Sequence, residues 1–178
     1  MSVRTLARLT LLGCSLLFAF CDEPTVASDS RPHERPATCV PGSDGPYEIA
    51  HVSDADTVVV RVPGRKPVTV RLIGVDAPEI DGPYRRAEPH GVASREFARS
   101  LLEDESVFLE SDPSQAEVDR YGRRLAYVHR SRDCLMINGE IIRQGHGESY
   151  RKFRFRHREL FARYEQEARI NRRGMWKR

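Results

Sequence analysis

Hydrophobic and polar residues alternate through the middle of the chain in short runs that are rich in β-branched side chains. Runs of this kind, bounded by Gly, Pro and Asp, are typical of β-strands. Five strands are expected, at Tyr47–Val52, Thr57–Val62, Pro67–Val75, Ser106–Glu110 and Arg124–His129. The residues Pro63-Gly64-Arg65-Lys66 predict a turn between the second and third strands.

Apolar residues recur at helical spacing in three other segments. These are Val92–Glu103, Ile137–Gln144 and His157–Asn171, with Gly145 and Gly174 as expected helix stops. One helix therefore separates the third strand from the fourth, and the other two follow the fifth. This order predicts an α+β fold that is mainly β, a five-stranded OB-fold barrel with about three helices.

The N-terminus has the pattern of an export signal. Arg4 and Arg8 precede Leu9–Phe20, an uncharged run of twelve residues, which is shorter than the roughly 20 residues that span a bilayer. We predict a signal peptide over 1–21, a Pro-rich linker over 22–45 and one domain over 46–178. The protein is then secreted or periplasmic. A lipoprotein signal, with Cys21 or Cys14 lipidated and the protein tethered to a membrane, is the alternative.

Composition narrows the class of protein. The 178 residues are 39% hydrophobic and 31% charged, which excludes a disordered polyampholyte and a membrane bundle. The formal net charge of +3 is unevenly placed, because residues 140–178 hold twelve Lys and Arg against five Asp and Glu. An acidic body with a basic C-terminal part suggests a metal site and a polyanionic partner.

Carboxylates gather at two predicted strand ends, Asp54-Ala55-Asp56-Thr57 and Asp76-Ala77-Pro78-Glu79. Such oxygens suit Ca²⁺, Mg²⁺ or Mn²⁺, and the lack of nearby Cys or paired His argues against Zn²⁺. Asp and Pro are also common turn residues, so ordinary turns are the competing interpretation. Barrel curvature could bring Asp56 beside Asp76.

Two arginines stand near these carboxylates in the expected topology. Arg71 lies inside an apolar strand, where a guanidinium is costly to bury unless it is paired or awaits an anion. Arg123 precedes the fifth strand, where a solvated charge is the ordinary explanation. Two guanidiniums beside a metal site would suit phosphate oxygens.

The acidic and arginine residues lie in short motifs that follow one another along the chain. The motifs are Asp54-Ala55-Asp56-Thr57-Val58, Arg71-Leu72-Ile73-Gly74-Val75-Asp76-Ala77-Pro78-Glu79, Asp119-Arg120-Tyr121-Gly122-Arg123-Arg124-Leu125-Ala126-Tyr127-Val128, Ile142-Arg143-Gln144-Gly145 and Gly174-Met175-Trp176. In sequence and spacing the chain resembles the staphylococcal nuclease family from Tyr47 to Trp176.

The resemblance implies a Ca²⁺-dependent phosphodiesterase that cleaves DNA and RNA with little sequence specificity, as a monomer without a stable protein partner. It assigns roles by family position. Asp56, Asp76 and the Ala77 carbonyl would hold one divalent ion, Glu79 would be the general base, Arg71 and Arg123 would bind the phosphate, and Arg120 and Tyr121 would contact a neighbouring phosphate.

The chain departs from the family pattern at four places, one of which is the composition of the segment Asp81–His90. Ala55 replaces a common Gly, which would strain the turn if its φ were positive. Ala77 replaces a common Thr, and the run 151–158 is more basic than the resemblance requires. That run is either a nucleic-acid contact or a solvated loop. Stacking on bases is expected at Tyr121 and Tyr150, whereas Phe153 and Phe155 are equally consistent with the core.

Cys14 and Cys21 fall in or beside the signal, which leaves Cys39 and Cys134 as a disulfide pair in the mature chain, with two free thiols as the alternative. Two other functions compete with the nuclease. A non-catalytic nucleic-acid-binding OB domain would not need the carboxylates, and a Ca²⁺-stabilised structural module would leave Arg71 unexplained.

Overall fold

The structure of the chain is a computed structural model that describes residues 39–81 and 86–177. The predicted signal peptide, and the linker as far as residue 38, lie outside these residues. Cys39 is joined to Cys134 by a disulfide with a Cα–Cα distance of 5.2 Å, and the two cysteines are 95 positions apart in sequence. The bridge joins the segment before the first strand to the turn that follows β6.

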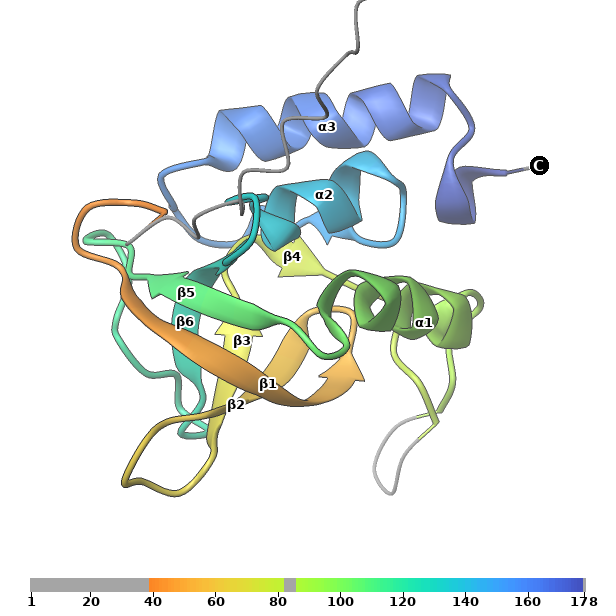
Figure 1. The fold of residues 1–178 in the computed structure, drawn as a ribbon. Coiled ribbons are helices and arrows are strands. Elements are labelled where there is room, and N and C mark those ends of the chain that lie inside the picture. Colours follow the sequence, from red (N-terminus) through yellow and green to blue (C-terminus); the bar gives the residue numbers. More distant parts are fainter. Residues whose placement is uncertain (1–38, 82–85, 178) are drawn as a thin grey trace, which may run out of the picture. The chain divides into compact units, whose positions relative to one another are not determined.

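Five strands form a closed barrel (Figure 1). They are β1 (Asp44–Asp54), β2 (Thr57–Arg61), β3 (Val68–Leu72), β5 (Ser106–Glu110) and β6 (Arg124–Arg130), and they pair in the order β1-β2-β3-β6-β5. All pairs are antiparallel except β3–β6. Register shifts in β1 allow this long strand to bend and to pair with both β2 and β5. The predicted five-stranded barrel is confirmed.

The barrel core follows from alternation along the strands, because successive side chains point inward and outward. The fully buried set from four strands consists of Val58, Val60, Val70, Leu72, Val107, Leu109, Ala126 and Val128. The polar residues between them lie at the barrel ends and on its outer face.

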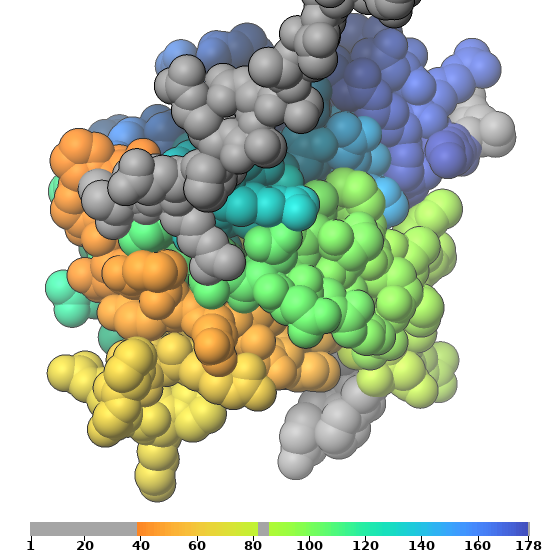
Figure 2. Space-filling view, in the orientation of Figure 1, coloured from red at the N-terminus to blue at the C-terminus, as the bar shows by residue number. Residues whose placement is uncertain are grey.

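Three helices cover the barrel, as predicted: α1 (Gly91–Leu102), α2 (Ile137–Arg143) and α3 (Arg158–Ile170). α2 lies between the barrel and α3 (Figure 1). α1 packs beside β1, where the two are adjacent on the face that Figure 2 shows. Gly174 starts the 3-10 turn η1 (Gly174–Trp176) beyond the end of α3. None of the helices in the described part of the chain is long and apolar enough to cross a membrane.

The predicted third strand is divided into two strands. β3 ends at Leu72, Gly74 has a φ of +77°, and β4 (Val75–Asp76) pairs instead with β7 (Glu148–Ser149). A Cβ at Gly74 would lie 2.6 Å from the ring of Phe155, so only glycine allows this corner. The corner directs Asp76 away from the barrel wall and into a separate two-stranded sheet.

Candidate active site

A cleft of about 850 Å³ opens where the β1–β2 turn, the β3–β4 corner, the loop before β6 and the segment after β7 meet. The predicted site residues that line it are Asp56, Arg71, Asp76, Glu79, Arg120, Tyr121, Arg123 and Tyr150. Ala77 is buried directly beside Asp76. Segments that are far apart in the sequence therefore contribute to one site.

Asp56 is buried and joins the two acidic turns. Its Oδ1 accepts a hydrogen bond of 2.8 Å from the Thr57 hydroxyl, and its Oδ2 accepts one of 3.2 Å from the Ala77 N–H. The Asp56 carbonyl also accepts a bond of 2.8 Å from the Leu72 N–H. These contacts hold the β1–β2 turn against the β3–β4 corner, which brings Asp56 next to Asp76.

Ala55 fits this turn without backbone strain. Its φ is not positive, so the position does not demand glycine, and its side chain is buried. The departure from the family pattern is therefore accommodated by the local conformation.

Arg71 lies between the two carboxylates. Its Nη1 is 2.5 Å from Asp56 Oδ2 and 3.2 Å from the Asp56 carbonyl oxygen, and its Nη2 is 3.9 Å from Asp76 Oδ1. The Arg71 side chain is largely buried, whereas that of Asp76 is 56% exposed. Pairing with Asp56 offsets the desolvation of the guanidinium, and the half-exposed Asp76 keeps its oxygens open to the cleft.

Asp54 also lines the cleft, and the sequence reasoning assigned it no role. Its Oδ1 is buried and has no hydrogen-bond partner within the described residues. Burial and the neighbouring charge of Asp56 raise the pKa of the Asp54 carboxyl. The Asp-x-Asp pattern could have indicated a role for Asp54, because it places a second carboxylate in the same turn as Asp56.

A hard cation suits the chemistry of these donors. Among residues 39–81 and 86–177, no group of three or more His, Cys, Asp or Glu side chains is arranged to hold a metal ion. The predicted ligands, however, are two carboxylates and a main-chain carbonyl, and Asp54 adds a buried oxygen that lacks a partner. Oxygen donors of this kind fit Ca²⁺ or Mg²⁺.

The loop that carries Glu79 rests on the start of α1. The Glu79 N–H donates to the Glu88 carboxylate at 3.2 Å, and the Glu88 N–H donates to the Glu79 carbonyl at 2.9 Å. A Cβ at Gly91 would overlap that same carbonyl oxygen. Gly91 is thus a site-positioning residue that the sequence reasoning missed, although a glycine at a helix start was visible.

Asp119 holds the loop before β6 in place and was also missed. Its carboxylate accepts bonds from the N–H groups of Tyr121 and Arg123, both 2.9 Å, and from Arg123 Nε at 2.7 Å. Burial opposes ionisation of Asp119, but the hydrogen bonds from Arg123 and Tyr121 outweigh it and lower the pKa of Asp119. Asp119 therefore orients Arg123 toward the cleft as a permanently charged group.

Comparison with known proteins agrees with this geometry. Residues 69–178 match the family described as "Staphylococcal nuclease homologue". The thermonuclease of Staphylococcus hyicus is 31% identical over 132 residues, which cover 73% of this chain and 75% of that protein. The thermonuclease of Staphylococcus intermedius is 32% identical over 150 residues, covering 83% and 84%.

A protein named micrococcal nuclease from Shigella flexneri is 32% identical over 136 residues, covering 72% of each chain. The chain belongs to the staphylococcal nuclease family. This membership supports a nuclease function for the chain.

In this staphylococcal nuclease homologue the aromatic candidates divide by exposure. Tyr121 is 64% exposed and Phe153 60% exposed, and both line the cleft. The Tyr150 and Phe153 ring centroids are 5.7 Å apart. Phe155 is instead buried against Phe161 and belongs to the core. Arg120 lies over the Tyr121 ring at 4.7 Å. The cleft thus combines charged groups with exposed aromatic faces.

Proposed function

We propose that the protein hydrolyses phosphodiester bonds in DNA and RNA with little sequence specificity, with the help of one divalent cation, Ca²⁺ before Mg²⁺ or Mn²⁺. The observation that supports this is the convergence of Asp56, Arg71, Asp76, Glu79 and Arg123 in one cleft. A domain that only binds nucleic acid does not need buried and half-buried carboxylates beside its phosphate-binding groups.

The acidic residues supply the cation site. Asp56, Asp76 and the Ala77 carbonyl are the proposed ligands, and Asp54 lines the same cleft. A carboxylate has about four lone-pair sites, and Asp56 uses three of them on Thr57, Ala77 and Arg71. When bound, the cation acts as a Lewis acid on a phosphate oxygen.

The two arginines bind the phosphate and stabilise the charge that builds up in the transition state. A guanidinium has five N–H donors, and Arg71 directs only Nη1 at Asp56 within hydrogen-bond distance. Arg123 uses Nε and Nη2 on Asp119. Both side chains therefore keep donors for phosphate oxygens, and fixed charges in a cleft stabilise a transition state without reorganising.

Glu79 acts as the general base. It removes a proton from the attacking water, a step that contributes typically about 10²–10⁴-fold. The bonds to Glu88 and the contact with Gly91 hold its backbone in place.

Low base specificity follows from what the cleft contacts. Charged groups contact phosphates, which carry no sequence information. The exposed rings of Tyr121 and Phe153 and the half-buried ring of Tyr150 can stack on any base. We assign Arg120, which donates to the Tyr121 hydroxyl at 2.6 Å, to contact with a neighbouring phosphate.

We further propose that the protein is exported and acts as a monomer. The Cys39–Cys134 disulfide supports export, because disulfides persist in oxidising compartments. A lipid anchor at the N-terminus remains the alternative to free release.

The test is cleavage of supercoiled plasmid and of a long RNA by the purified protein, with Ca²⁺, with excess chelator, and with Ca²⁺ restored. We expect cleavage of both substrates that stops with chelator and returns with Ca²⁺. Undiminished cleavage in chelator would overturn the metal assignment. Binding without cleavage under every condition would favour the non-catalytic OB domain.

A further inference from the structure

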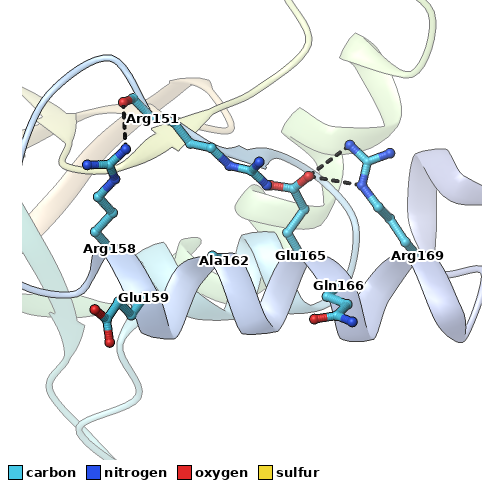
Figure 3. A pocket seen from close by; sticks show the side chains of 7 residues that line it. All are labelled: Arg151, Arg158, Glu159, Ala162, Glu165, Gln166 and Arg169. Atoms are coloured by element: carbon cyan, nitrogen blue, oxygen red, sulfur yellow. Dashed lines mark hydrogen bonds and ion pairs between the residues drawn. The ribbon is translucent and has the colours of Figure 1, made fainter.

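A second concave surface runs along α3, outside the cleft. It has a volume of about 620 Å³ and is lined on one side by Arg151, Arg158 and Arg169, which we call the guanidinium row. Figure 3 shows the three guanidinium groups along the same side of α3. Glu159, Ala162, Glu165 and Gln166 complete the lining of the surface. The row includes part of the basic run 151–158, whose role the sequence left open.

A buried carboxylate fixes two members of the row. Glu165, whose side chain is only 4% exposed, accepts a bond of 3.0 Å from Arg151 and bonds of 2.9 Å and 2.8 Å from Arg169. The Ser149 N–H also donates to it, at 3.1 Å. Arg169 lies over the Trp176 ring at 3.5 Å. These contacts restrict both guanidiniums before any ligand binds, which lowers the entropy cost of binding.

The surface keeps an excess of positive charge, because its lining holds three arginines against two carboxylates, Glu159 and Glu165. Glu165 is shared by two arginines, and Glu148, half-exposed, reaches only Arg169, at 3.7 Å. Arg158 donates to the Arg151 carbonyl at 3.4 Å and pairs with no carboxylate in the part of the chain that the structure describes. Most of the fifteen N–H donors of three guanidiniums therefore remain for an anion.

The row continues from the cleft. Tyr150, Lys152 and Phe153 line the cleft, while Arg151, between them in sequence, lines the surface along α3. Residues 158 to 169 of α3 span about 16 Å at 1.5 Å per residue. A strand that leaves the cleft past Tyr150 and Phe153 therefore meets positive charge over a length of several nucleotides.

We propose that the guanidinium row binds backbone phosphates of the nucleic-acid strand beyond the cleft. This proposal rests on the proposed function, because it names a further binding surface for the same substrate. Its ligand is a run of consecutive phosphates, so the row adds affinity for long substrates and none for a substrate that ends within the cleft.

The test uses the variants Arg158→Gln and Arg151→Gln/Arg158→Gln, with Arg163→Gln as the matched control. Arg163 is exposed on the same helix and does not line the surface. Binding of a fluorescent trinucleotide and of a single strand of about 20 nucleotides, longer than a typical single-stranded site, is measured by anisotropy in chelator over a range of salt. Cleavage of both is measured with Ca²⁺.

We expect the two row variants to lose roughly three- to tenfold in affinity for the long strand, with the salt slope of log K reduced by about 0.7 for each phosphate that the row no longer neutralises. The trinucleotide and the Arg163→Gln control should be unaffected. Arg158→Lys should recover part of the affinity, because it keeps the charge.

Unchanged binding of the long strand by the double variant would overturn the proposal. An equal loss for both lengths would also overturn it, because the row would then act through the cleft. A wild-type protein that cleaves neither substrate refutes the proposed function alone, since the anisotropy measurement still reports on the row.

Discussion

Two clusters of carboxylates and arginine lie in different parts of the barrel domain, and they differ in how fully their oxygens are used. In the cleft, Asp76 is half-exposed and Asp54 Oδ1 has no partner within the described residues. Just beyond the end of β5, Asp112 is buried and accepts bonds from the Tyr127 hydroxyl at 2.6 Å and the Arg156 N–H at 2.7 Å. Ser114 donates to its other oxygen.

Glu110, close to Asp112 in sequence, also has a partner for each carboxylate oxygen. It pairs with His129 at 2.9 Å and with the Arg156 guanidinium. Both carboxylates serve to attach the basic segment before α3 to the barrel. Residue type alone therefore does not separate a structural cluster from a chemical one. What separates them is the acceptor capacity left after the fold has satisfied its own donors.

The largest expected effect is on catalysis in the cleft. Glu79→Gln should lower kcat by roughly 10²–10⁴-fold with little change in substrate binding, because the amide cannot take a proton. Asp76→Asn should weaken cation affinity instead, so saturating Ca²⁺ should restore part of its rate. Both should unfold in urea like the wild type, and Asp81→Asn is the control.

If Ca²⁺ rescues Glu79→Gln as fully as it rescues Asp76→Asn, Glu79 is a ligand or a loop-ordering residue rather than the base. If either variant unfolds much more easily than the wild type, the cleft cluster is structural, like the cluster of Asp112 and Glu110.

The next largest effect concerns the packing of the Glu79 loop on the start of α1. Gly91→Ala places a methyl group against the Glu79 carbonyl and should displace the loop. Misplacement by about 1 Å can cost up to about 10²-fold in rate, so kcat should fall by roughly ten- to a hundredfold while cation affinity is retained. Val92→Ala, at an exposed neighbouring position, should leave kcat unchanged. If Gly91→Ala kept the wild-type kcat, the loop that carries Glu79 would accommodate the methyl group without displacing the base.

Asp112→Asn should affect stability rather than chemistry. The amide keeps one acceptor oxygen, but its NH₂ must face either Ser114 or the pair Tyr127 and Arg156, which donate as well. The free energy of unfolding should therefore fall by about 1–3 kcal/mol. Urea denaturation measures this change, and kcat of the folded enzyme should equal that of the wild type. A drop in kcat with unchanged stability would place Asp112 in the chemical cluster after all.

The smallest effect is a dependence of stability on pH. Burial opposes ionisation of Asp112, but its hydrogen bonds with Tyr127 and Arg156 outweigh burial and lower its pKa from 3.8 to about 2. Because the folded pKa lies below the unfolded one, Asp112 stabilises the fold above pH 3.8, and this contribution is lost as the pH falls toward about 2. The stability difference between wild type and Asp112→Asn should therefore be constant near neutral pH and narrow in acid. A difference that is the same in strong acid and at neutral pH would contradict the assignment.

The barrel was predictable because β-branched alternation and Gly or Pro turns act locally, residue by residue. The division of the predicted strand at Gly74 was not, since it depends on the Phe155 ring that arrives from much later in the chain. The pairing of β4 with β7 was missed for the same reason: two-residue strands carry no periodic signal of their own.

The site shows the same limit. Asp56, Arg71, Asp76, Glu79 and Arg123 were recognised from short motifs in the right order. The residues that position them, Asp119 and Gly91, look like an ordinary turn carboxylate and an ordinary helix-start glycine. Their roles exist only through the atoms that they meet across loops.

The barrel, the family resemblance and the residue types available for chemistry could all be read from the sequence, because periodicity and motif spacing are properties of the chain. Which carboxylates are satisfied and which remain open became visible only in the folded molecule. The fold saturates Asp112 and Glu110 against Tyr127, His129 and Arg156, and leaves Asp54 Oδ1 without a partner in the described residues. Hydrogen-bond satisfaction depends on distances between groups that are remote in sequence, so no local pattern can state it.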